Sequence, residues 1–249
     1  MQIYRRLTAI KAISFDLDDT LYNNLPIMLA IEPKMQDYFS AKFTTLSPEV
    51  NTAFDRYFWA PYRHQALATF KNIGHDVAKL RFETYRLGFL AHNVNAQQAV
   101  VEAHAGLAYF VKLRSDFRVP AISHSLLSQL CRRFPLVAIS NGNVDTSVLG
   151  IDHYFQHIYH AGFQQSDTDS CEQLLKQKPA IDMFTLALND LAILPEQLLH
   201  VGDCGFADVH GALNAGCQTA WLPKYGIGKP LRQIPHLELA NIDELLSFV

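Results

Sequence analysis

The sequence predicts an α/β protein in which a parallel-sheet core is interrupted, after its first strand, by an all-α insertion. From about residue 120 onward, apolar runs typical of buried strands alternate with helical patterns, and repeated units of this kind build a parallel sheet with helices on both faces. Residues 25–113, in contrast, contain long helix-compatible stretches, few glycines and no strand pattern. We therefore expect a discontinuous α/β core at 1–23 and 115–249 and a helical domain at 24–114.

The N-terminal half is expected to hold one strand followed by four helices. Residues 12–15 form a short apolar run that ends in a polar cluster, as a buried strand does. The last helix of the insertion has Asn95 as its N-cap and Gln98 three residues later. Pro61 is expected to break or kink the second helix. The candidate helices cover residues 27–43, 48–70, 76–90 and 95–113.

The C-terminal half alternates helices with strands. A helix with apolar residues at helical spacing is expected to end at Pro135, and another to have Pro179 in its first turn. A third helix is expected over 207–215, with Gly216 directly after it. Short apolar runs predict strands at residues 136–139, 198–201 and 218–222.

Composition excludes several classes of partner. The 249 residues include 21 Lys and Arg against 24 Asp and Glu, a net charge of −3, so no basic excess favours nucleic acid or an anionic membrane. No window approaches the roughly 18 consecutive apolar residues of a membrane span, and the start of the chain lacks the apolar region of a signal peptide. We expect a cytoplasmic monomer or homodimer. Its cysteines have no zinc-site spacing and are expected to be reduced thiols: Cys131, Cys171, Cys204 and Cys217.

The strongest chemical signal is the run Asp16-Leu17-Asp18-Asp19-Thr20, which directly follows the first strand. Carboxylates at the mouth of a buried strand destabilise the protein unless a cation binds them. Ser140 and Asp203 also follow predicted strands, and the carboxyl ends of parallel strands meet at one edge of the sheet. Together with Lys178, these residues predict phosphoryl transfer through an aspartyl nucleophile.

Each residue type suits one role in that reaction. Asp16 can attack phosphorus and form an aspartyl-phosphate that water then hydrolyses, and Asp18 can protonate the leaving oxygen and later deprotonate the water. Lys178 can neutralise Asp16 and the phosphoryl oxygens. Mg²⁺ prefers oxygen ligands, which Asp16, Asp203 and the backbone carbonyl of Asp18 can supply.

The remaining polar residues can hold the substrate or the site in place. The Ser140 hydroxyl and nearby backbone N–H groups, within Ser140-Asn141-Gly142, can bind the phosphoryl oxygens. Thr20 can fix the first loop by hydrogen bonding. Asp208, five residues after Asp203, can orient Lys178 or a metal-bound water from outside the metal's own ligands.

These residues resemble the haloacid dehalogenase-like superfamily of aspartyl-phosphate hydrolases. The resemblance rests on DxDxT at Asp16–Thr20, the serine at 140, the lysine before Pro179, and GD…D at 203 and 208. It covers the whole chain and implies a Rossmann-like core, Mg²⁺ and an α-helical cap at the position of the insertion. The FDLDDTLY start and SNGN are similar to bacterial phosphatases of flavin mononucleotide and of the phosphorylated ribitylamino-uracil precursor of riboflavin. The partner so implied is a small phosphorylated metabolite.

Two positions depart from or complicate the family pattern. Cys204 stands where the family often has Asp or Ser, which removes an oxygen from the metal's surroundings. Lys176 competes with Lys178 for the role of motif lysine, although Pro179 favours Lys178. In the insertion, Trp59 and Tyr62 near Pro61 can stack on a flat substrate or pack the core of the helices.

Other functions remain open on the same fold. A 2-haloacid dehalogenase uses the same aspartate on carbon, but needs neither Mg²⁺ nor an acid at the position of Asp18. A phosphomutase uses the same residues and differs in how water is excluded. A non-catalytic binding protein would have no need of the complete set of polar groups that this chain retains.

Overall fold

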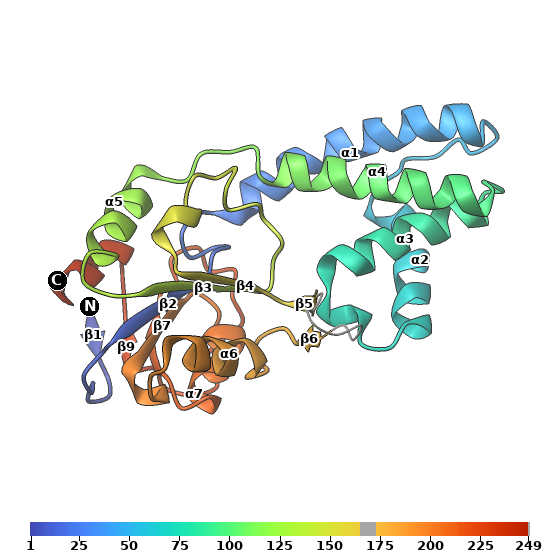
Figure 1. Ribbon diagram of the computed structural model, residues 1–249. Helices are drawn as coiled ribbons and strands as arrows, with labels where there is room; N and C mark the ends of the chain where they lie inside the picture. The colour runs from blue at the N-terminus through green and yellow to red at the C-terminus, as the bar shows by residue number, and fades with distance from the viewer. Residues whose placement is uncertain (165–172, 249) are drawn as a thin grey trace. The chain divides into compact units, whose positions relative to one another are not determined.

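In the computed structural model, which describes residues 1–164 and 173–248, the chain divides into two units (Figure 1). The first unit comprises residues 1–24, 117–142 and 146–249, and the second comprises residues 25–116 with 143–145. One unit therefore contains the predicted α/β core, and the other contains the predicted helical insertion.

The first unit is built on a seven-stranded sheet with the order β1-β9-β8-β7-β2-β3-β4. Every neighbouring pair is parallel except β1 with β9, which is antiparallel. The α/β class and its parallel sheet are thus confirmed. The strands are β1 (Gln2–Ile3), β2 (Ala12–Phe15), β3 (Leu136–Ser140), β4 (His157–His160), β7 (Leu198–Gly202), β8 (Gln218–Trp221) and β9 (Leu237–Glu238).

Sequence patterns located four strands of the sheet and missed the two edge strands, β1 and β4, and the short β9. β2, β3 and β7 are buried at every position, so they have the continuous apolar character of strands covered on both faces. β4 has the sequence His-Ile-Tyr-His, and β1 and β9 have two residues each, which leaves no apolar run to recognise. A separate hairpin of β5 (Gly162–Gln164) and β6 (Gln173–Leu175) was likewise not predicted.

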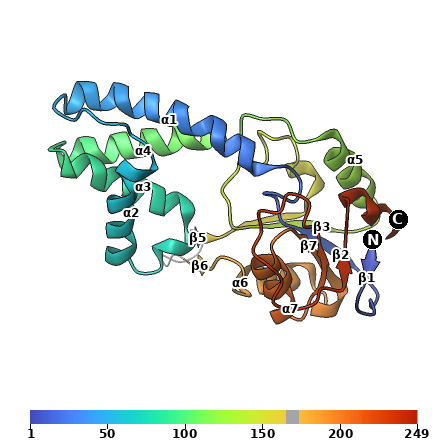
Figure 2. The same cartoon turned by 180° about the vertical axis from the view of Figure 1, so that it is seen from behind.

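Helices cover both faces of the sheet, with α5 (Ala121–Leu130) on one face and α6 (Asp182–Leu191) and α7 (Gly211–Asn214) on the other (Figures 1 and 2). On the α6 face, Phe184 and Leu188 pack in one core with Val137 of β3. These contacts bury the apolar stripe of α6 and hold the strand ends rigidly.

Three helix boundaries differ from the predicted ones. α5 ends at Leu130 and residues 131–134 form a turn, so Pro135 does not directly end it. α6 begins at Asp182, three residues after Pro179, whose preceding peptide bond is cis. The segment expected to be helical over 207–215 begins as a π-helical turn at Gly205–His210 and continues into α7. Gly216 follows with φ +81°, as expected of a residue just past a helix.

The second unit contains α1 (Asn24–Leu46), α2 (Arg56–Thr69), α3 (Val77–Ala91) and α4 (Ala96–Arg114). α1 lies along α4, and α2 lies along α3 (Figures 1 and 2). The rings of Phe43 and Phe89 stack in the core of this unit, and the ring of Phe39 packs tilted against Phe89. Asn95 accepts a hydrogen bond from the Gln98 backbone, which confirms it as the N-cap of α4.

The helix break that was one expected effect of Pro61 does not occur, since α2 runs without interruption through this residue. The acceptor that loses its partner is the carbonyl of Tyr57, a residue in the first turn that is 69% exposed. The helix begins later than expected, at Arg56, since Asp55 caps it by accepting from the backbone N–H groups of Tyr57 and Phe58. None of the described helices is both long enough and apolar enough to cross a membrane.

Candidate active site

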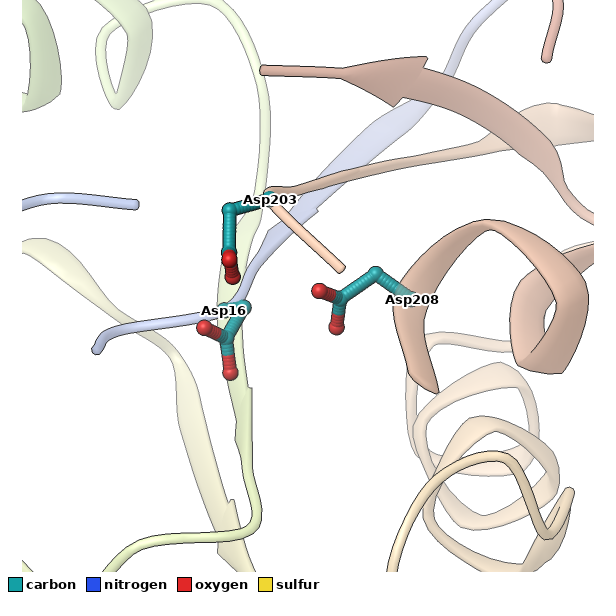
Figure 3. A group of neighbouring side chains, drawn as sticks. All are labelled: Asp16, Asp203 and Asp208. Atoms are coloured by element: carbon teal, nitrogen blue, oxygen red, sulfur yellow. The ribbon is translucent and has the colours of Figure 1, made fainter. Parts of the chain in front are cut away.

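Three neighbouring parallel strands bring the predicted residues to one edge of the sheet. Asp16 directly follows β2, Ser140 ends β3 and Asp203 directly follows β7, and β2 lies between the other two. Carboxylate oxygens of Asp16, Asp203 and Asp208 lie within 4.8 Å of one another. Figure 3 shows these three side chains turned toward one shared space.

Lys178 is buried within this acidic group. Its Nζ donates to Asp16 Oδ1 at 2.6 Å, to Asp208 Oδ1 at 2.7 Å and to the Ile139 carbonyl at 2.6 Å. An ammonium group has three N–H donors, so protein acceptors occupy all of them. Lys178 therefore acts on the site through its charge and by fixing both carboxylates. Lys176, the competing lysine, is exposed.

Burial and charge act on the two partners of Lys178 in different ways. Burial raises the pKa of Asp16 well above its usual range, and the neighbouring acids Asp208, Asp18 and Asp203 add to this effect against the opposing charge of Lys178. Burial also acts on Asp208, but there Lys178 and the hydrogen bond from His200 outweigh it and lower the pKa. A further positive charge beside Asp16 would therefore favour its ionised form.

The raised pKa of Asp203 also favours a bound cation. Burial, with added repulsion from Asp208 and Asp19, raises the pKa of Asp203 to about 7. The Asp203 side chain lies against Gly228, where a Cβ atom would come within 2.6 Å of Asp203 Oδ2. Burial raises the pKa of both Asp16 and Asp203, so a bound cation would favour the ionised form of each. Carboxylate oxygens of this kind are the ligands that Mg²⁺ prefers.

Asp208 is close enough to join a metal site, but its oxygens are already in use. Oδ1 accepts from Lys178 and His200, and Oδ2 accepts from the Cys204 backbone at 2.9 Å. We therefore assign Asp208 to the support of Lys178, and Asp16 and Asp203 to the cation. Gly202 makes this support possible, since a Cβ there would lie 2.3 Å from the Asp208 carboxyl carbon.

The Asp18 side chain lies over the loop that follows β3. Its Oδ1 accepts from the Tyr22 hydroxyl at 2.7 Å, and its Oδ2 would be 2.6 Å from a Cβ at position 142. A Cβ at Gly142 would therefore displace the Asp18 carboxylate. The Gly142 N–H donates to the Ser140 hydroxyl oxygen at 3.0 Å. Asp18 is thereby brought beside the Ser140 loop, where the sequence predicted phosphoryl binding.

Asn141 has a role that sequence reasoning did not anticipate. Its side-chain Oδ1 accepts from the Lys178 backbone N–H at 2.8 Å, and its Nδ2 donates to the Lys178 carbonyl at 3.1 Å. This pair of bonds holds the motif lysine beside β3, 37 residues away in sequence. Asn141 was predicted to bind substrate, and the contacts present here are to Lys178.

The first loop is held by its own polar residues. Asp19 adopts a left-handed backbone with φ +58°, and its Oδ1 accepts from the Asn24 N–H at the start of α1. The Thr20 hydroxyl is buried 3.4 Å from Asp16 Oδ2, a long contact that fixes the loop weakly.

His200 and Ser14 also belong to this site and were not singled out from the sequence. His200 Nδ1 lies 2.8 Å from Ser14 Oγ, and its Nε2 lies 3.2 Å from Asp208 Oδ1. Burial lowers the pKa of His200, so the ring is neutral. A histidine inside the apolar run Leu198–Gly202 was the available signal, because a buried imidazole requires partners.

In the second unit, the aromatic residues both pack and line a cavity. The ring centroid of Trp59 lies 4.5 Å from that of Phe39 and 4.9 Å from that of Tyr85. Its indole N–H donates to the Phe54 carbonyl. A cavity of about 510 Å³ is lined by Trp59 together with Arg81. Tyr62 does not line it, and its hydroxyl instead lies 2.9 Å from His92 Nε2.

The cysteines take part only in local contacts among the described residues. Cys204 Sγ accepts from the backbone N–H groups of Ala207 and Lys229, both at 3.3 Å. Cys131, Cys204 and Cys217 are free cysteines, and Cys171 lies outside the described residues.

Sequence comparison identifies a family and several phosphatases. Residues 10–216 match the haloacid dehalogenase-like hydrolases. The chain is 34% identical over 253 residues to the 5-amino-6-(5-phospho-D-ribitylamino)uracil phosphatase YigB of Escherichia coli, with 100% of both chains covered. It is 25% identical to the N-acylneuraminate-9-phosphatase of Homo sapiens, over 96% of this chain and 93% of that protein.

Solved structures agree with this assignment. A 2-haloacid dehalogenase from Pseudomonas syringae superposes with a TM-score of 0.82 at 25% identity, covering 96% of this chain and 97% of that one. The HAD-hydrolase YfnB from Bacillus subtilis bound to magnesium superposes with a TM-score of 0.61 at 17% identity, covering 97% and 99%. At that identity the second likeness concerns the fold alone.

Proposed function

This chain belongs to the haloacid dehalogenase-like hydrolases, and from that premise we propose that it is a Mg²⁺-dependent phosphatase acting on a small phosphomonoester. The observation that carries the proposal is the buried Lys178–Asp16 ion pair, at 2.6 Å, beside two further acids, Asp18 and Asp203. A nucleophile, an acid and a cation site then share one edge of the sheet. Three curated relatives with phosphatase names support this reading.

The first half-reaction begins at Asp16. Lys178 holds Oδ1, so we assign the attack on phosphorus to Oδ2. The new O–P bond forms as the bond to the leaving oxygen breaks, and Asp18, in its protonated form, gives that oxygen its proton. The Ser140 hydroxyl and backbone N–H groups near it bind the equatorial phosphoryl oxygens, with Thr20 supporting the loop.

The second half-reaction regenerates the enzyme. Asp18, now ionised, takes a proton from water, and the water oxygen attacks the phosphorus of the aspartyl-phosphate. The O–P bond to Asp16 breaks and inorganic phosphate leaves. Lys178 neutralises the Asp16 carboxylate before the attack and again after its release, because Asp208 and the Ile139 carbonyl hold the Lys178 ammonium in place.

Mg²⁺, when bound, supplies the positive charge that lets two anions approach each other. Asp16, Asp203 and the Asp18 backbone carbonyl would hold it, with Asp208 supporting from behind. The raised pKa values of Asp16 and Asp203 support this set of ligands.

For the substrate, we propose flavin mononucleotide or another phosphate of the riboflavin pathway. The 34% identity over the full length of YigB supports that choice. We assign 24–114 as the cap and 1–23 with 115–249 as the core. Trp59 and Tyr62 are our proposed contacts to a planar ring, supported for Trp59 by its place in the wall of the 510 Å³ cavity. A cytoplasmic location and a monomeric or dimeric state remain part of the proposal.

The test is release of inorganic phosphate from p-nitrophenyl phosphate, flavin mononucleotide, phosphorylated ribitylamino-uracil and sugar phosphates, with Mg²⁺ and with excess EDTA. We expect turnover only with Mg²⁺, and the highest kcat/KM on a riboflavin-pathway phosphate. Asp16→Asn should abolish turnover on all substrates, since an amide is a far poorer nucleophile. Full activity in EDTA would overturn the metal assignment, and an active Asp16→Asn would overturn the covalent mechanism.

A 2-haloacid dehalogenase is the second candidate, because a structure of that name superposes with a TM-score of 0.82. That reaction forms the ester on carbon and requires neither Mg²⁺ nor the acid at Asp18. Chloride release from 2-chloropropionate in EDTA, without phosphate release from any ester, would favour it over the phosphatase.

A further inference from the structure

We propose that His200 is a positioning residue, which, together with Ser14, fixes Asp208 so that Lys178 stays against the nucleophile Asp16. The inference rests on the proposed function, since it assigns a supporting role within that reaction. Neither residue is expected to touch the substrate.

The sheet itself places the pair. Ser14 of β2 and His200 of β7 are directly opposite each other in the parallel register, and both are at most 1% exposed. Side chains alternate along a strand, so Ser14 shares its face of β2 with Asp16. The Phe184 and His200 rings are perpendicular, with their centroids 4.9 Å apart. This contact leaves the imidazole little room to rotate.

The directions of the hydrogen bonds follow from their partners. Asp208 is ionised, and a carboxylate only accepts, so His200 Nε2 carries the proton and donates to Asp208 Oδ1 at 3.2 Å. In the neutral ring Nδ1 is then an acceptor, and the Ser14 hydroxyl donates to it at 2.8 Å. Asp208 thus selects the tautomer, and Ser14, whose hydroxyl can donate or accept, satisfies the Nδ1 atom that this tautomer leaves as an acceptor.

The consequence reaches the reacting carboxylate through Lys178. Asp208 Oδ1 accepts from both His200 and Lys178, while Oδ2 accepts from the Cys204 backbone. These donors together leave the Asp208 carboxylate one orientation. Without the Nε2–H group, Asp208 can rotate, and the ammonium between Asp208 and Asp16 loses its fixed position.

The central test compares His200→Leu with His200→Gln, whose side-chain amide can replace the Nε2–H donor. On p-nitrophenyl phosphate we expect His200→Leu to lower kcat about 10- to 100-fold, the range of one hydrogen bond to a charged group, with KM changed by less than about threefold. His200→Gln should recover most of kcat. Ser14→Ala, which leaves His200 Nδ1 without its donor, should give an intermediate loss.

His236→Leu is the matched control. His236 Nδ1 accepts from the Thr219 backbone beside β8 and does not contact Asp208, so its removal should leave kcat near wild type. An unchanged kcat in His200→Leu would overturn the proposal. Equal losses in His200→Leu and His200→Gln, at melting temperatures close to wild type, would do so as well.

A measurement without turnover separates this proposal from the proposed function. Long-range ¹H–¹⁵N spectra of the wild-type protein should show His200 protonated at Nε2 and not at Nδ1. In Ser14→Ala the proton should stay on Nε2, while the Nδ1 resonance shifts because its hydrogen-bond donor is lost. Protonation at Nδ1 would overturn the inference even if the enzyme is a phosphatase. Because these spectra are recorded on the wild-type protein, they test the inference even if His200→Leu does not fold. A wild-type protein that hydrolyses no ester would overturn the proposed function instead.

Discussion

The side-chain amide of Asn141 forms two hydrogen bonds with the backbone of Lys178, one to its N–H at 2.8 Å and one from Nδ2 to its carbonyl at 3.1 Å. An amide matches both backbone groups because it offers an acceptor and a donor side by side. The lysine that neutralises the nucleophile is therefore placed by a residue at the end of β3, and the two motifs act as one unit.

Replacing Asn141 should therefore reduce turnover without removing any group from the reaction. In Asn141→Asp the donor to the Lys178 carbonyl becomes a second acceptor, so we expect a stability loss of about 1–3 kcal/mol and a clear fall in kcat. Thermal melting and steady-state kinetics measure the two effects. Asn141→Leu should behave in the same way, and a Leu variant with wild-type kcat would show that the clamp is dispensable.

The metal-free protein should become less stable as the pH rises from about 4 to about 7. The pKa of Asp203 is raised to about 7 from an ordinary value of about 3.9, so in this window the folded state binds more protons than the unfolded state. Stability then falls with increasing pH. Melting temperatures in EDTA should drop less steeply for Asp203→Asn than for wild type.

Mg²⁺ should reverse that loss. A bound cation replaces the proton on Asp203, so it should raise the melting temperature by several degrees at about pH 7.5 and by much less at about pH 5, where protons compete. Asp203→Asn should respond weakly at both values. Equal stabilisation of wild type and variant would place the cation elsewhere.

Gly142→Ala should impair the chemistry more than the fold. The added Cβ would lie 2.6 Å from Asp18 Oδ2, so Asp18 must move from its bond with the Tyr22 hydroxyl. We expect kcat to fall at least tenfold, because a misplaced acid–base group affects both half-reactions. Phosphate-release kinetics with a melting curve will measure this, and wild-type kcat would show that Asp18 has no fixed position.

Truncating Trp59 tests its contact with a ring. Trp59→Ala should raise KM for flavin mononucleotide about 10- to 100-fold, if a stack worth roughly 1–3 kcal/mol is lost. A small acyl phosphate, which has no ring to stack, should be affected much less. Because Trp59 also packs on Phe39 and Tyr85, melting curves are the control: equal losses on both substrates with a lower melting temperature would leave only a packing role.

The sequence by itself determined the α/β class, the helical insertion and the buried strands β2, β3, β7 and β8. Local patterns suffice for these, since strands buried on both faces are largely apolar. It also identified Asp16, Ser140, Lys178, Asp203 and Asp208 as one site, because each polar residue follows a strand or a turn signal, and strand ends in a parallel sheet converge. The edge strands β1 and β4, and the two-residue β9 between β1 and β8, carry no such pattern and were missed.

Only the tertiary structure decided which of these groups touch. Lys178 uses all three of its donors on protein acceptors, and Asn141 holds its backbone, through contacts between residues far apart in sequence. The support of Asp208 by Ser14 and His200 depends on the register of β2 with β7. A hydrogen bond requires a particular distance and direction, and neither is encoded in the local pattern. Pro61 illustrates the same limit, because the carbonyl it leaves without a partner lies in the first turn of α2, whose start could be located only once Asp55 was seen to cap it.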